Sequence, residues 1–356
     1  MALEITRLRL YNQQVAWGKL TRPDDVVTWL GAMQAQDYNS VKWAVGLRCQ
    51  GATDTSIEQA IADRTILRTW LLRGTLHLVS PEDVHWMLAL LAPRLIKSGA
   101  RRDRELELDE ATYTSSIKVL IYELHGSKQS TRQELMSALN RAGISTKGQR
   151  GYHILARAAL RGLICFGPQR EKEQTFVLLD EWAPPGRQFA QEEALAELAR
   201  RYFAGHGPAT LADFSWWCGL PAKQARAGLE LVKAGLRQED IEGQTYWFQP
   251  ASAGQHDGLP AVYLLPGFDE YYLGYTDRSL LLDAKYERRA VSSNGIFRPM
   301  IIIDGLVAGI WKRDIKKGLV VLKPQPFERL TEAQERALRA AIISYGEFLG
   351  LPVELA

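Results

Sequence analysis

Apolar residues recur at helical spacing through the middle of the chain and predict three consecutive helices there. The three helices are Ile117–Leu124, Thr131–Ala142 and Gln149–Leu160. Thr131 and Glu134 have the spacing of a capping box, which marks the start of the second helix. Two short runs rich in β-branched and aromatic residues, 162–167 and 175–179, then predict a hairpin. Three helices followed by a hairpin is the order of a winged helix, so we expect one over residues 111–183.

The same order repeats after Ala183-Pro184-Pro185-Gly186, which is typical of a linker. The expected helices and strands are Ala190–Ala204, Leu211–Trp217, Pro221–Lys233, Leu236–Gln238 and Thr245–Phe248. A second winged helix is therefore predicted over residues 187–250. Trp216 and Trp217 could stack on bases, but aromatic pairs in a small helical unit usually belong to the core, and we favour the core.

The two ends of the chain have different patterns. Residues 1–110 predict several helices, the first containing Ile5 to Trp17, followed by one strand over Leu71–Val79 and a helix start at Ser80-Pro81. This order is compatible with a third winged-helix-like unit. Residues 259–356 predict a β-rich part, in which the strand Val262–Leu265 runs on into residues 266–272.

A hairpin with an Asp304-Gly305 turn, the strand Leu319–Leu322 and a final helix, Thr331–Leu349, complete that part. The expected fold class is therefore α+β. It combines tandem winged-helix units, three in number, with a C-terminal β-rich part and a terminal helix.

Composition and charge exclude several classes of protein. The 356 residues are 46% hydrophobic and 24% charged, as in an ordinary globular chain, and the net charge of +3 neither requires nor excludes a nucleic-acid partner. The three cysteines are far apart and suggest neither a disulfide framework nor a zinc site. No apolar run resembles a signal peptide or a membrane span, so we expect a cytoplasmic protein without membrane contact, metal or cofactor.

Gln34 and Gln36 stand out because they follow an amphipathic segment, residues 23–33, that needs no polar residue at that point. Residues at i and i+2 point about 200° apart on a helix, so both amides can serve one ligand only if the backbone leaves the helix between them. A solvated pair at a helix end is the alternative interpretation.

Gln34-Ala35-Gln36 resembles the glutamine-x-glutamine motif of the bacterial winged-helix DNA glycosylases, the AlkZ-like or YcaQ-like family. The resemblance continues through four further motifs in order: Asn12-Gln13, Arg73-Gly74-Thr75-Leu76-His77, Phe268-Asp269-Glu270-Tyr271 and Asp304-Gly305. It implies a monomeric, nucleoid-associated enzyme of base excision repair. Its substrate would be double-stranded DNA carrying purines alkylated at N7 or N3, with bulky adducts and interstrand crosslinks as further candidates.

The resemblance also implies that Gln34 and Gln36 hold the water and the nucleotide. Amides do not exchange protons at neutral pH, but N7 alkylation already makes the base a cationic leaving group, so positioning can suffice. A sister branch of the family has aspartate at the second glutamine. No lysine is singled out as a Schiff-base nucleophile, so a monofunctional enzyme is expected. The rival hypothesis is a non-enzymatic winged-helix transcriptional regulator.

Basic side chains gather in two places and predict contacts with DNA phosphates. The candidates are Lys147, Arg150, Arg157 and Arg161 near the third helix of the first winged helix, Lys312, Arg313, Lys316 and Lys317 near the last hairpin, and Arg73 and His77 of the shared motif. A solvated basic face is the alternative, and His153 is expected to be structural. Asp269 or Glu270 alone is a candidate for acid-base or metal chemistry, because neighbours on a strand point to opposite faces.

Overall fold

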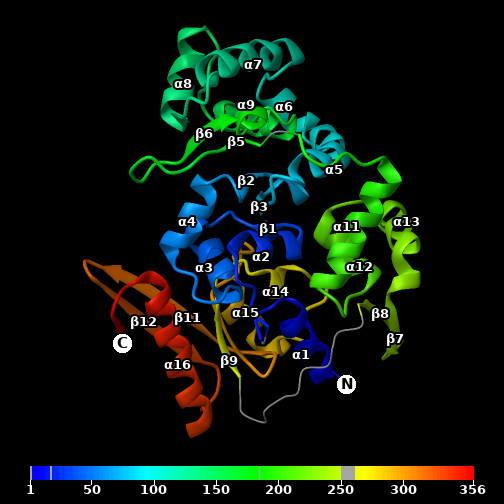
Figure 1. Ribbon diagram of the computed structural model, residues 1–356, viewed down its shortest axis with the longest axis vertical. Helices are drawn as coiled ribbons and strands as arrows, with labels where there is room; N and C mark the ends of the chain where they lie inside the picture. Colours follow the sequence, from blue (N-terminus) through cyan, green and yellow to red (C-terminus); the bar gives the residue numbers. More distant parts are fainter. Residues whose placement is uncertain (1, 17, 184, 250–260) are drawn as a thin grey trace. The chain divides into compact units, whose positions relative to one another are not determined.

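The computed structural model describes residues 2–16, 18–183, 185–249 and 261–356, and it confirms the α+β class (Figure 1). The chain forms two compact units that do not follow chain order. The first unit combines residues 1–58 with residues 195–356, and the second comprises residues 59–194. Trp17 of the expected first helix and Pro184 of the expected linker lie outside the described residues. No described helix is long and apolar enough to cross a bilayer.

The second unit contains the first predicted winged helix. Its elements are α7 (Glu110–Leu124), β4 (Ser130–Thr131), α8 (Arg132–Arg141), α9 (Arg150–Leu160), β5 (Ile164–Phe166) and β6 (Thr175–Leu178). Strand β4 pairs with β6, which pairs with β5, as the three-stranded edge of a winged helix requires. Helix α7 begins before the predicted Ile117, because the Asp109 carboxylate accepts the backbone N–H of Thr112 and caps it. The Thr131–Glu134 capping box is confirmed.

The prediction of a single strand over Leu71–Val79 is wrong, because the chain reverses direction within this range. The elements there are β2 (Leu67–Trp70), a 3-10 turn (Leu72–Gly74) and β3 (Leu76–Val79), with β2 and β3 antiparallel. Arg73 and Gly74 both have positive φ, 55° and 74°, which turns the strand back on itself. Strand β2 also pairs with β5, so β3, β2, β5, β6 and β4 follow one another in this unit's sheet.

Helices α5 (Val84–Ser98), α6 (Ala100–Glu105) and α10 (Leu179–Trp182) complete the second unit. The helix predicted to start at Ser80-Pro81 begins instead at Val84. Ser80 still acts locally, because its hydroxyl accepts the backbone N–H of Glu82 at 3.3 Å.

The predicted second winged helix lies in the first unit, apart from the start of its first helix. Its elements are α11 (Gln191–Gly205), α12 (Leu211–Cys218), α13 (Ala222–Val232), β7 (Arg237–Ile241) and β8 (Gln244–Phe248). Ala209 pairs with Trp247 of β8 through two backbone hydrogen bonds, in the same place as β4 in the other segment. Both segments thus contain three helices followed by two paired strands.

The C-terminal part forms a five-stranded sheet in the order β13, β12, β11, β10, β9, and α16 packs on it (Figure 1). The bounds are β9 (Val262–Leu265), β10 (Met300–Ile303), β11 (Leu306–Lys316), β12 (Leu319–Pro326), α16 (Glu332–Leu349) and β13 (Val353–Leu355), with the short helices α14 (Glu270–Leu273) and α15 (Glu287–Ala290) between β9 and β10. Asp304 and Gly305 turn the β10–β11 hairpin with φ of 51° and 92°, as predicted.

One expectation for this part is wrong, since β9 does not run on into residues 266–272. Pro266-Gly267 ends the strand, Phe268 has φ of 63°, and Asp269 caps α14 by accepting the backbone N–H of Tyr271 at 2.9 Å. Asp269 and Glu270 therefore stand at a helix start, where their side chains diverge into different surroundings.

Candidate active site

The Gln34–Gln36 segment joins two helices of the first unit, with Gln34 at the end of a short strand and Gln36 in a bend. Helix α2 (Pro23–Leu30) ends three residues earlier than the pattern suggested, because Gly31 takes φ of 77° and its N–H bonds the carbonyl of Thr28. The short strand β1 (Met33–Gln34) follows. Helix α3 (Tyr38–Arg48) then begins at Asp37, whose carboxylate accepts the backbone N–H of Ser40.

Burial alternates along this segment and separates the amides from their neighbours. Met33 and Ala35 are buried at 1% and 0% exposure, whereas Gln34 is half-buried and Gln36 is exposed. The requirement that the backbone leave the helix is met, because α2 ends at Leu30, and both amides are more exposed than Met33 and Ala35.

The backbone of Gln34 is held by a buried carboxylate from the far end of the chain. The N–H of Gln34 donates to Glu270 Oε1 at 2.8 Å, and the indole N–H of Trp217 donates to Glu270 Oε2 at 3.0 Å. His206 Nε2 lies 3.4 Å from the same Oε2, and Glu270 is only 1% exposed. Sequence patterns marked Glu270 as a candidate but gave no sign of these partners.

Asp269 anchors helix α3 through the side chain of Arg48. Its two carboxylate oxygens accept bonds from Arg48 Nη1 and Nη2 at 2.9 and 2.7 Å. Arg48 Nη2 also donates to the side-chain oxygen of Gln13, and Asn12 donates to the carbonyl of Gly207. The Asn12-Gln13 motif is therefore part of a buried hydrogen-bond network that holds α1 (Ala2–Asn12) and α3 together.

Tyrosine hydroxyls near this network remain protonated donors. Burial raises the pKa of Tyr275 above its ordinary range, and its O–H donates to the carbonyl of His206 at 2.7 Å. Burial likewise raises the pKa of Tyr271, whose O–H donates to the carbonyl of Gly305. Neither hydroxyl can act as a base at neutral pH. Among the residues described, no group of three or more His, Cys, Asp or Glu side chains could hold a metal ion.

Trp217 and Trp216 have different surroundings. Trp217 is fully buried, in agreement with the core interpretation. Trp216 is 43% exposed and donates its indole N–H to the carbonyl of Leu273, so the core interpretation is wrong for this residue.

The arginines of α9 are largely bound within their own unit. Arg157 is 9% exposed and pairs with Asp103, and its guanidinium lies over the Tyr113 ring. Arg150 donates to backbone carbonyls, including those of Ser145 and Glu107. Arg161 is exposed and donates to both carboxylate oxygens of Glu110 at 2.6 and 2.8 Å.

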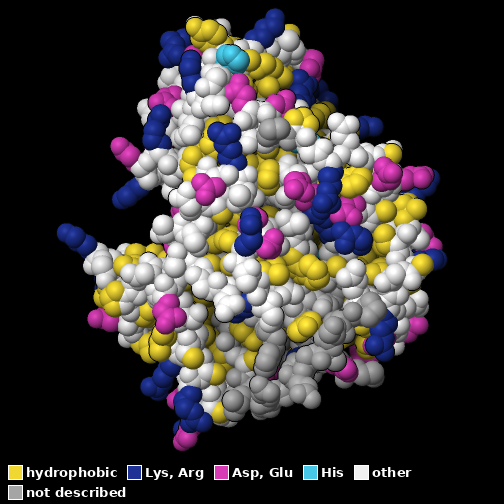
Figure 2. Space-filling model, in the orientation of Figure 1, with side chains coloured by type: hydrophobic (Ala, Val, Ile, Leu, Met, Phe, Trp, Pro, Cys, Tyr) yellow, Lys and Arg dark blue, Asp and Glu magenta, His cyan; other side chains and the backbone are white. Residues whose placement is uncertain are grey.

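The remaining predicted contacts are also spread between surface and interior. Lys147 and Lys312 are exposed, and Arg73 is half-buried at the turn between β2 and β3. His77 is fully buried in β3, and its Nδ1 lies 3.0 Å from the carbonyl oxygen of Thr75. Arg313 donates to the Tyr345 hydroxyl. Figure 2 shows basic and acidic side chains interspersed over the face in view.

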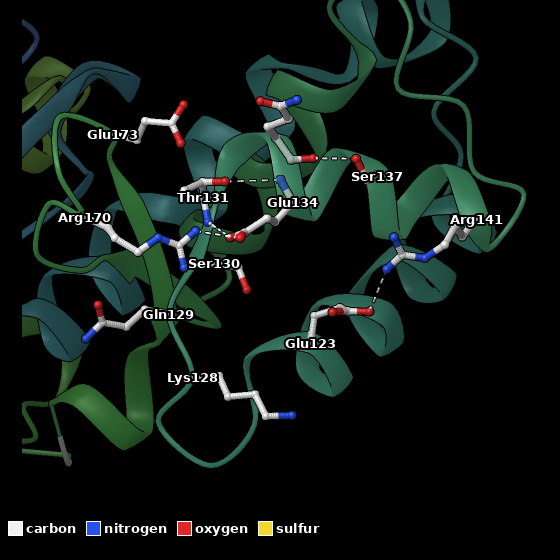
Figure 3. Close-up of a pocket in the computed structure, with 11 residues that line it drawn as sticks. Glu123, Lys128, Gln129, Ser130, Thr131, Glu134, Ser137, Arg141, Arg170 and Glu173 are labelled. Atoms are coloured by element: carbon white, nitrogen blue, oxygen red, sulfur yellow. Dashed lines mark hydrogen bonds and ion pairs between the residues drawn. The ribbon is translucent and has the colours of Figure 1, made fainter.

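A depression of about 700 Å³ in the second unit does not favour an anion (Figure 3). It is lined by residues of α7, α8 and the neighbouring loops, with three glutamates among three basic residues. Arg170 pairs with Glu134 at 2.6 Å, and Arg141 pairs with Glu123 at 3.4 Å. Because these charges balance, the depression has no net attraction for phosphate.

Comparisons with known proteins agree on one class of enzyme. The chain is 28% identical to the interstrand DNA cross-link repair glycosylase of Streptomyces sahachiroi. The matched region spans 328 residues and covers 86% of each protein. It matches the solved structure of the Streptomyces sahachiroi DNA glycosylase AlkZ with a TM-score of 0.82 and 24% identity over 99% of both chains, a likeness of fold. The non-enzymatic regulator is therefore set aside. Residues 27–348 match the AlkZ-like DNA glycosylases, so the chain belongs to that family and is a hydrolase that acts on N-glycosyl bonds in DNA.

Proposed function

We propose that this enzyme hydrolyses the N-glycosidic bond of purines alkylated at N7 or N3, with Gln34 and Gln36 as its catalytic residues. The observation that carries the proposal is the alternating burial of residues 33–36. Met33 and Ala35 are buried in the core, whereas Gln34 is half-buried and Gln36 is exposed. Two amides placed in this way can act on one nucleotide.

The chemistry suits residues that cannot exchange protons. A purine alkylated at N7 is cationic and leaves without strong protonation, so the enzyme must mainly hold water and sugar in a reactive arrangement. An amide oxygen can accept a hydrogen bond from the attacking water, and an amide N–H can donate to the sugar or phosphate. Gln34 and Gln36 supply both groups.

The lysine nearest in sequence to the two glutamines is unsuited to cleaving the DNA strand, which supports release of the base alone. Lys42 on α3 is 4% exposed and forms ion pairs with Asp54 at 2.9 Å and Glu58 at 2.7 Å. A lysine bound in this way is a poor Schiff-base nucleophile, because that chemistry requires an accessible neutral amine. We therefore propose a monofunctional glycosylase.

DNA contact is proposed for the basic residues at the surface. They are Arg73, Lys147, Lys312, Lys316 and Lys317, whereas the pairing or burial of His77, Arg150, Arg157, Arg161 and Arg313 gives those residues structural roles. We further propose that a monomer acts on double-stranded DNA of the nucleoid. Bulky adducts and interstrand crosslinks are included as substrates because the Streptomyces sahachiroi relative is described as a cross-link repair glycosylase.

The test is incubation with DNA that carries N7-methylguanine, followed by measurement of the released base and of strand breaks. We expect free N7-methylguanine and abasic sites, with strand breaks only after alkaline treatment. Undamaged DNA of the same sequence is the control. DNA binding without release of any alkylated purine would contradict the proposal.

A further inference from the structure

Glu270 receives hydrogen bonds from two parts of the chain that are distant in sequence. Its Oε1 accepts the backbone N–H of Gln34 at 2.8 Å, across 236 residues of chain. Its Oε2 accepts the indole N–H of Trp217 at 3.0 Å and lies 3.4 Å from His206 Nε2. The carboxylate thus joins the proposed catalytic segment to α12.

Burying a carboxylate costs free energy, so a buried carboxylate must make interactions that offset this cost. Ionised groups in a protein interior lose their hydration and must recover it through bonds with good geometry. Glu270 is 1% exposed, and the backbone N–H of Gln34 replaces part of its lost hydration. The side chain of Gln34 is the one proposed to act on DNA. The bond falls on the peptide between Met33 and Gln34, where a small rotation would redirect both amides.

We propose that Glu270 is a positioning residue that fixes the direction in which Gln34 and Gln36 project. This inference rests on the proposed catalytic role of the two glutamines. Gly31 ends α2 before the segment, Asp37 caps α3 after it, and Glu270 holds the backbone N–H of its first residue, Gln34. Glu270 itself does not touch the substrate, because it is enclosed in the core behind the segment.

The carboxylate is required because it accepts hydrogen bonds on both oxygens and donates none. A glutamine at position 270 has only one amide oxygen to receive the two donors. If that oxygen faces the N–H of Gln34, the amide nitrogen faces the indole N–H of Trp217, and two donors oppose each other. If the amide is reversed, the same conflict arises at Gln34.

The first experiment measures single-turnover excision and DNA affinity for Glu270→Gln. Displacing catalytic groups by about 1 Å can lower the rate on the order of 10²-fold, so we expect a fall of that size with little change in affinity. Amide hydrogen exchange at Gln34 should become faster in the same variant. Asp269→Asn is the matched control, because it neutralises the adjacent buried carboxylate, which holds Arg48 rather than Gln34. It should lower the melting temperature with a smaller loss of rate.

The second experiment removes the opposing donor. In Glu270→Gln with Trp217→Phe, the amide oxygen can turn to the N–H of Gln34 while the amide nitrogen no longer opposes the indole N–H, although His206 Nε2 stays beside it. We expect this double variant to excise faster than Glu270→Gln alone, although two core residues have changed. A general loss of stability would instead make the double variant slower.

The outcomes separate this inference from the proposed function. If Gln34→Ala abolishes excision while Glu270→Gln keeps the parent rate, Glu270 has no positioning role and the proposed function stands. A double variant slower than Glu270→Gln likewise overturns the positioning role. If Gln34→Ala and Gln36→Ala both excise at the parent rate, the proposed function fails and this inference fails with it. Faster exchange at Gln34, slower excision and recovery in the double variant support the inference.

Discussion

The Gln34–Gln36 segment of the first unit and helix α9 of the second unit hold polar side chains in opposite ways. In the segment, carboxylates hold backbone N–H groups: the buried Glu270 binds that of Gln34, and the exposed Asp37 caps α3 at Ser40. In α9, partners hold the side-chain ends themselves, as Asp103 does for Arg157 and Glu110 for Arg161. The residues proposed to act on the substrate are thus held through their backbone, whereas the arginines are held through their own charge.

The largest effect expected from this comparison is on the stability of the second unit. Arg157→Ala leaves the Asp103 carboxylate buried without its charge partner, which costs about 3–5 kcal/mol for a buried pair. Arg161→Ala, at the C-cap of the same helix, should cost about 1 kcal/mol or less, because its partner Glu110 is largely exposed. Urea denaturation of both variants measures the difference. Equal losses would remove the distinction between the two arginines.

Gln34→Ala should affect catalysis and leave the fold intact. Losing one polar contact made in the transition state lowers the rate on the order of 10²–10³-fold, by analogy with oxyanion-hole donors. Single-turnover excision of N7-methylguanine measures the rate, and circular dichroism and DNA affinity are the controls. A loss of affinity equal to the loss of rate would indicate that Gln34 only binds DNA.

Gln36→Asp should have a smaller effect than either alanine variant. It reproduces the aspartate of the sister branch, keeps an acceptor at an exposed position and should retain part of the activity. Comparing excision of N7-methylguanine and N3-methyladenine tests whether the preference for the lesion changes. Activity below that of Gln36→Ala would show that the position requires an amide donor.

The smallest effect is expected for a phosphate contact. Lys147→Ala removes an exposed cation beside α9 and should lower the slope of log affinity against log salt by about 0.9. Lys118→Ala, an exposed lysine on α7, is the control and should leave the slope unchanged. If the two variants have the same slope as the parent, Lys147 is a solvated residue.

Local patterns predicted most of the fold because local interactions form it. The Thr131 and Thr331 caps, the Asp304-Gly305 turn and the helices of both tandem segments depend on residues a few positions apart, and the sequence displays them directly. The strand expected over Leu71–Val79 was wrong because Arg73 is not a residue type that announces a positive φ.

The site was only partly predictable, because it depends on a contact between residues far apart in sequence. The resemblance and the break in the helical pattern marked Gln34 and Gln36, but the pattern alone placed them at a helix end. The helix ends early because of Gly31, and the backbone of Gln34 is held by a carboxylate 236 residues away. A contact at that separation leaves no periodic signal, so Glu270 could be singled out but not connected with Gln34.

The discontinuity of the first unit determines when during synthesis the enzyme can become active. Residues 59–194 are contiguous and can fold as soon as they leave the ribosome, but Gln34 must wait until Glu270 has been made. At typical translation rates of about 5–20 residues per second, this interval is roughly 10–50 s. A nascent chain therefore carries its glutamine motif without the carboxylate that orders it. Hydrolysis of glycosidic bonds should begin only after the C-terminal part has folded around the N-terminal helices.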